Sequence, residues 1–196
     1  MKALVEKAIH DLAPLGAEIF EISIPELVNA ETAVLVVSGA EGTSQHHENL
    51  LNPTLRHMYQ EDVRIQLEAG ELVSGVEYVK GQKARRLLRD GFYRAFTKVD
   101  VIVAPTVPIP APHFTPNQTK LNFEVLNACT PFTCPANLTG LPSLSIPVGL
   151  TMEGLPVGMQ IFGKPFAEGQ LLEVGYAYEQ ISPMKDVVAG DRMLTS

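Results

Sequence analysis

Residues 134–163, CPANLTGLPSLSIPVGLTMEGLPVGMQIFG, decide the fold of this chain. The pattern predicts a short helix, a tight loop and a β-hairpin. Pro135 suits a first helical turn, where its missing N–H costs nothing, and Gly140 suits the end of that helix. Apolar residues alternate along 143–150 and 156–162, with a turn expected between them. Because a hairpin with one apolar face is not stable alone, other elements must cover it.

The rest of the chain alternates between predicted helices and strands. Ser74 and Glu77 have the spacing of a capping box, which predicts the start of a long helix. The other expected elements are a helix at 2–13, a strand at 17–24, a buried helix at 26–39, a partly looped segment at 41–62, a buried parallel strand at 100–104, a proline-rich extended loop at 105–120, a helical segment at 121–130 and a last helix at 167–181.

This alternation predicts the α/β class, with a mixed β-sheet covered by helices and a hairpin and a helix at its end. The length of 196 residues and the 45% hydrophobic content fit a single domain over residues 1–196. Residues 183–196 are expected to form a loose tail.

Composition excludes several classes of function. The net charge of −7 argues against nucleic-acid binding driven by phosphate neutralisation. The sequence has no apolar run that would span a membrane, so no membrane association is expected. Cys129 and Cys134 are the two cysteines, which favours a reducing, cytoplasmic location. No cofactor is expected, and His46, His47 and His57 are interpreted as residues of a solvated loop and not as a metal site.

Six segments of the chain resemble the amidase signature family of serine amide hydrolases, whose members include one of the subunits of glutamyl-tRNA amidotransferase. They occur in the family's order and correspond to its C-terminal half. The segments are LAPLGAEIFEISIP (12–25), VRIQLEAGELVSGVEY (63–78), VDVIVAPTVP (99–108), PANLTGLPSLSIPVG (135–149), LPVGMQIFG (155–163) and EGQLLEVGYAYEQ (168–180). The resemblance implies that this chain is the C-terminal part of the amidase fold.

The resemblance also implies a catalytic Ser–Ser–Lys triad in a glycine- and serine-rich segment of the family's N-terminal half. These 196 residues contain no such segment. We therefore assign no catalytic residue in this chain. Ser143 and Ser145 are expected to be ordinary residues of the hairpin.

The family's C-terminal half contributes one wall of the substrate pocket. By resemblance, Thr130 matches an aspartate that helps the amidotransferase to bind glutamine, and Gln66 matches an arginine with a similar role. Both charges are absent here, so a less polar amide is the expected substrate. Thr130 and Phe132 are the predicted pocket-lining residues; the alternative is that both are ordinary core or loop residues.

Two classes of function remain open. The first is an amide hydrolase of carbon–nitrogen bonds, present as a truncated gene product, one part of a split enzyme or a piece of a longer protein. The second is a non-catalytic interaction module that retains part of the amidase fold. A small-molecule amide is the expected substrate, and an exposed sheet edge predicts self-association or a complementary N-terminal amidase fragment as partner. A basic run along 80–94 is interpreted as a solvated helix face or a partner surface.

Overall fold

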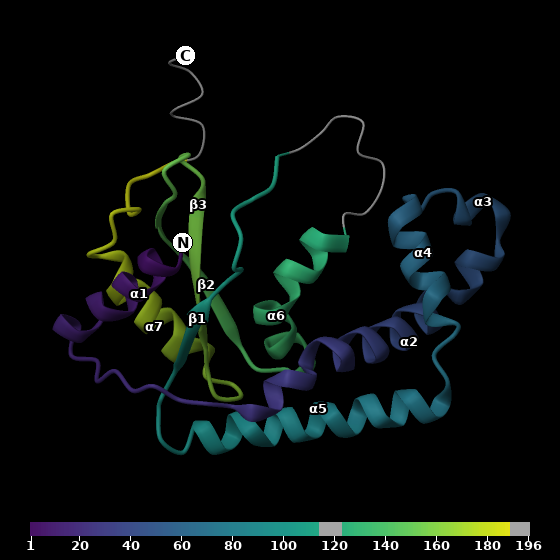
Figure 1. Cartoon of the computed structure of the whole chain (residues 1–196), viewed down its shortest axis with the longest axis horizontal. Coiled ribbons are helices and arrows are strands. Elements are labelled where there is room, and N and C mark those ends of the chain that lie inside the picture. Colours follow the sequence, from purple (N-terminus) through teal and green to yellow (C-terminus); the bar gives the residue numbers. More distant parts are fainter. Residues whose placement is uncertain (114–122, 189–196) are drawn as a thin grey trace, which may run out of the picture. The chain divides into compact units, whose positions relative to one another are not determined.

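A computed structural model describes residues 1–113 and 123–188. The chain divides into two compact units (Figure 1). The sheet unit consists of Met1–Glu21, Val99–Ala111 and Leu141–Ser196, and the helical unit of Ile22–Lys98 and Pro112–Gly140. Whether the chain is a single domain stays a prediction.

The sheet unit contains three antiparallel strands, β1 (Ile102–Pro105), β2 (Ser143–Leu150) and β3 (Pro156–Phe162), in the order β1-β3-β2. Val103 of β1 pairs with Ile161, and Ile146 of β2 pairs with Met159. The α/β class is confirmed. The parallel direction expected for residues 100–104 is wrong, because a short apolar run indicates burial but does not fix the direction of a strand.

Helices α1 (Lys2–Asp11) and α7 (Glu168–Glu179) complete the sheet unit. Their apolar faces meet the face of the sheet that carries Val157 and Met159. Met159 is 0% exposed and Val157 1%. The buried core that the two helices share with the strands consists of Val5, Ala8, Leu12, Val148, Val157, Met159 and Tyr178.

The β2–β3 hairpin forms as predicted. Gly154 adopts a φ of 81° in its turn, where the Thr151 N–H donates to the Leu155 carbonyl at 2.8 Å. A bulge between Pro147 and Gly149 shifts the register of β2. Pro147 is tolerated because β2 is an edge strand of the described sheet, where a missing N–H removes no ladder bond to a second neighbour.

The helical unit is built around α2 (Ala30–Leu51), which packs against α4 (Glu61–Gly70), α5 (Gly75–Ala95) and α6 (Phe123–Thr139). Figure 1 shows α2 and α5 running side by side. A 3₁₀ turn at Pro25–Asn29 precedes α2, and the four-residue helix α3 (Pro53–Arg56) follows it. The predicted capping box is confirmed: the Ser74 hydroxyl accepts from the Glu77 N–H at 3.2 Å and the Glu77 carboxylate accepts from the Ser74 N–H at 2.9 Å.

Two expectations near the N-terminus are wrong. Residues 17–24 form no strand, and Phe20 is 60% exposed. Their alternating pattern is local, whereas a strand requires a neighbouring strand, and the described sheet contains no partner for this segment. Residues 41–51 are helical because α2 continues to Leu51, so His46 and His47 lie on a helix and not in a loop.

The helix before the hairpin is longer than expected. Helix α6 has 17 residues and contains Pro131 and Pro135 in its interior, so Pro135 does not begin a helix. Each proline removes one N–H, and packing against α2 and α5 holds the helix in place. Side-chain donors add further bonds: the Thr139 hydroxyl donates to the Pro135 carbonyl at 2.6 Å.

Three expected segments fall partly outside the described residues. These are the loop at 105–120, the helical segment at 121–130 and the tail at 183–196, which overlap residues 114–122 and 189–196. The described part of the 121–130 segment is helical from Phe123. In the described part of the tail, Lys185 donates to the side chain of Gln180 at 2.8 Å.

Candidate functional site

Two of the predicted pocket residues lie on α6. Thr130 and Phe132 are both half-buried. The Thr130 hydroxyl donates to the Glu31 carboxylate at 3.1 Å, which connects α6 to the first turn of α2 within the helical unit. The Glu31 carboxylate therefore lies beside Thr130, the residue that stands where the family resemblance implies an aspartate. Sequence reasoning missed Glu31 because 99 residues separate it from Thr130.

Cys134 lies one helical turn after Thr130 and is 5% exposed. Burial raises the pKa of its thiol, and the negative charge of Glu31 raises it further. Both effects favour the neutral thiol, which is a poor nucleophile. Cys134 is therefore a packing residue of this site and is not poised for covalent catalysis.

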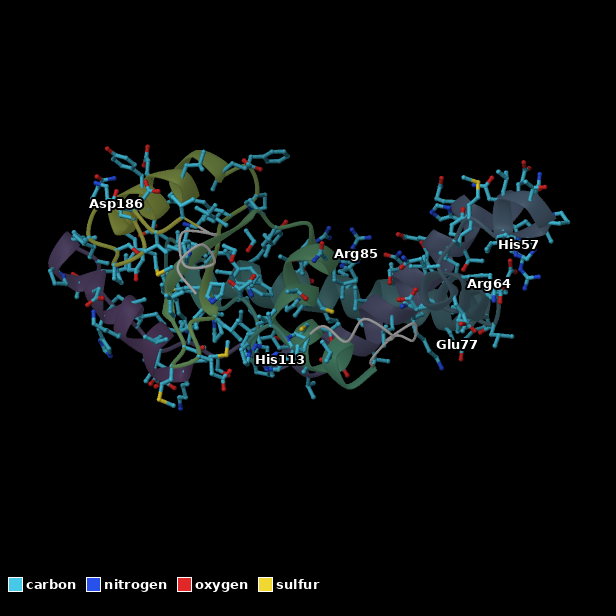
Figure 2. All side chains as sticks on the ribbon, turned by 90° about the horizontal axis from the view of Figure 1, so that it is seen from above. His57, Arg64, Glu77, Arg85, His113 and Asp186 are labelled. Carbon is cyan, nitrogen blue, oxygen red and sulfur yellow. The ribbon has the colours of Figure 1, made fainter. Side chains whose placement is uncertain are left out.

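Gln66 lies apart from Thr130. It is an exposed residue of α4, and α4 contacts α2 around Gly39 and Thr43, where the Thr43 hydroxyl donates to the Leu67 carbonyl. Twelve residues of helix separate Thr43 from Glu31, which corresponds to about 18 Å along the α2 axis. Figure 2 shows Arg64, two residues before Gln66, near His57 and distant from α6. The role of Gln66 as a pocket residue stays a prediction.

The two hairpin serines belong to a polar network on the sheet. The Ser145 hydroxyl lies 2.6 Å from the Thr106 hydroxyl, directly above Gly158, where a Cβ would approach the Thr106 Oγ1 to 2.7 Å. Ser143 donates to the side chain of Gln160, which donates to the Pro105 carbonyl. Among the described residues, no serine hydroxyl lies within hydrogen-bond distance of a lysine or histidine that could act as a base.

The histidines of α2 have individual partners. His46 Nδ1 lies 2.8 Å from the Tyr59 hydroxyl, and His47 Nδ1 lies 2.7 Å from a carboxylate oxygen of Glu71. No group of three histidine, cysteine or acidic residues in the described part of the chain could hold a metal ion. Of the helices in that part, none is long and apolar enough to cross a membrane.

These elements define an α/β chain with a three-stranded antiparallel sheet. A family model described as Amidase matches residues 1–172, and the chain belongs to this family. Among solved structures, it superposes on a crystal structure of an amidase with a TM-score of 0.80 and 27% identity, covering 92% of this chain and 42% of that one. It also superposes on a glutamyl-tRNA(Gln) amidotransferase component from Thermotoga maritima with a TM-score of 0.70 and 28% identity, covering 93% of this chain and 39% of that one.

Curated relatives show the same similarity. A fatty acid amide hydrolase from Medicago truncatula is 38% identical over 85% of this chain and 28% of its own length. An amidase from Pseudomonas putida is 35% identical over 92% of this chain and 39% of its own length. The chain thus spans less than half the length of the curated relatives it matches.

Proposed function

We propose that this chain is part of an amide hydrolase and supplies one wall of its substrate pocket. The main support for this proposal is the match to the amidase family over residues 1–172. Relatives named as an amidase and as a fatty acid amide hydrolase support it further. We further propose that it corresponds to the C-terminal part of the amidase fold, as the order of its motifs implies.

The catalytic groups, in this proposal, come from a complementary amidase segment. Ser143 and Ser145 have neutral hydrogen-bond partners, Gln160 and Thr106. A serine becomes a useful nucleophile when a base accepts its proton, directly or through a second hydroxyl as in a Ser–Ser–Lys triad, and neither a threonine hydroxyl nor an amide is itself such a base. The polar network of the hairpin is therefore assigned a structural role.

The proposed substrates are amides without a free carboxylate near Thr130. The Glu31 carboxylate would repel a substrate carboxylate there, and Thr130 carries no positive charge that could bind one. Phe132, half-buried one turn before Ala136, offers an aromatic ring to an apolar or aryl substrate group. A neutral aryl amide fits the side chains of Glu31, Thr130 and Phe132 better than the carboxylate end of glutamine does.

The test is an amide hydrolysis assay with and without the N-terminal segment of a family member, such as the Pseudomonas putida amidase, co-expressed with this chain. We expect no turnover by the chain alone and hydrolysis of a neutral aryl amide by the assembled pair, with glutamine a poor competitor. Phe132→Ala should raise KM for the aryl amide, whereas the control Ser145→Ala should leave both kcat and KM unchanged.

Two results would contradict the proposal. Turnover by the chain alone that Ser143→Ala or Ser145→Ala abolishes would place the nucleophile in the hairpin. A clear preference of the assembled pair for glutamine would contradict the assignment of Thr130 and Gln66.

A further inference from the structure

Helix α5 has an outward face that combines apolar and basic side chains. Its buried side carries Leu88, Phe92 and Ala95. The opposite side exposes three aliphatic residues: Val76 is 67% exposed, Val79 52% and Leu87 60%. Exposed apolar residues are normal when scattered singly, but grouped on one helix face they mark a candidate interaction surface.

The basic residues of this face lie between the aliphatic ones. Helix α5 contains six basic residues against two acidic ones, although the whole chain has a net charge of −7. Lys80 and Lys83 form no ion pair with any described residue, and Arg86 approaches Asp90 of the same helix at 3.9 Å. The positive charge of this face is therefore available to a partner.

Helix α7 of the sheet unit has an outward face of the opposite sign. Its three charged residues, Glu168, Glu173 and Glu179, are all acidic, and none forms an ion pair with a described residue. Leu172 and Tyr176 lie one turn apart on the same side and are 62% and 66% exposed. This face is apolar and acidic where the α5 face is apolar and basic.

A pocket of about 420 Å³ adjoins the α7 face within the sheet unit. Apolar side chains of β2 and α7 line it, among them Leu144, Ile146 and Leu172. Glu179 and Lys185 also border this pocket, and the Lys185 ammonium donates to the Gln180 side chain at 2.8 Å. The pocket therefore offers an apolar cavity with an adjacent carboxylate, which suits an apolar side chain flanked by a basic one.

We propose that the outward face of α5 in one copy of this chain binds the acidic face of α7 and its adjoining pocket in a second copy. Leu87 supplies the apolar side chain for the pocket, and Lys83 and Arg86 pair with Glu173 and Glu179. The charge complementarity identifies the occupant, because the acidic and apolar surface that α5 requires is present on the same chain.

The test uses charge reversal on either face and sedimentation velocity over a range of protein concentrations. Wild-type protein should self-associate, more weakly at high salt. The α5 variant K83E/R86E and the α7 variant E173K/E179K should each weaken association about tenfold or more, since two attractive pairs become repulsive. The matched control K2E/K98E reverses two exposed charges outside both faces and should associate as the wild type does. Circular dichroism confirms that each variant is folded.

The decisive arm mixes the two variants. The mixture pairs a reversed, acidic α5 of one variant with a reversed, basic α7 of the other, so opposite charges meet again. The mixture should therefore associate more tightly than either variant alone. A wild-type chain that stays monomeric up to its solubility limit would overturn the proposal. So would a mixture of variants that fails to associate, or a loss of stability in each variant that is independent of concentration. These outcomes do not depend on amidase activity.

Discussion

Both units bury large side chains, such as Met159 in the sheet unit and Phe92 in the helical unit, but among the described residues only the helical unit has helices in contact at glycines. The core of the sheet unit consists of large side chains on β3, where Val157, Met159 and Ile161 are 0–1% exposed. In the helical unit, glycines bring the helices together: a Cβ at Gly81 would approach Val37 to 3.0 Å, and one at Gly70 would collide with the Gly39 carbonyl and the Thr43 hydroxyl.

This difference determines which substitutions each unit tolerates. A core filled by large side chains is damaged when atoms are removed, because a cavity remains. A helix contact made at glycine is damaged when atoms are added, because backbone must move. Removal of side-chain atoms should therefore be most damaging on β3, and addition of atoms should be most damaging at the glycine contacts of α2.

The largest expected effect is that of Met159→Ala in the sheet unit. Met159 is fully buried in the core between the sheet and its helices, so the substitution should lower the free energy of unfolding by about 2–5 kcal/mol. Urea denaturation measures the loss. Hydrogen exchange should show it first in β1–β3, α1 and α7. The exposed control Leu172→Ala should change stability by less, and a similar loss in both variants would refute this account of the core.

The second-largest effect on stability is expected for Gly70→Ala in the helical unit. Gly70→Ala adds one methyl group against the α2 backbone and should destabilise the protein by about 1–3 kcal/mol. Gly75→Ala is the matched control, because nothing lies within 4 Å of its Cβ position at the start of α5. That change should be neutral or stabilising by about 0.4–1 kcal/mol. Equal effects in urea denaturation would show that α2 and α4 adjust freely.

The smallest effect concerns the capping box of α5, which depends on local hydrogen bonds and not on either core. Ser74→Ala should lower the free energy of unfolding by about 1 kcal/mol. Hydrogen bonds from the Ser74 N–H and hydroxyl group lower the pKa of Glu77 below its ordinary value of 4.5. A carboxyl with a lowered pKa stabilises the fold above that ordinary value, and the contribution is lost as pH falls through the folded pKa.

Glu77→Gln removes this titration, so the variant's stability should vary less with pH below 4.5 than that of the wild type. Thermal unfolding between pH 3 and pH 7 measures the difference. Parallel curves for the two proteins would show that the capping box does not contribute to the acid sensitivity of the chain.

Features set by neighbours in sequence could be predicted. The β2–β3 hairpin follows from alternation and turn residues, and the start of α5 follows from Ser74 and Glu77. Residues 17–24 have the same alternation as a strand, yet no described strand pairs with them. Pro131 and Pro135 indicate a helix boundary by local rules, but packing against α2 and α5 keeps them inside α6.

The sequence by itself determined the hairpin and the helix cap, because each depends on residues within a few turns of one another. It determined the family and the α/β class through the order of motifs and elements along the chain. The tertiary structure alone decided the antiparallel direction of β1, the contact of α4 with α2 at Thr43, and the position of the Glu31 carboxylate beside Thr130. Thr130 and Glu31 are 99 positions apart, so their contact depends on how α6 packs against α2. The local sequence around Thr130 does not indicate that Glu31 is its partner.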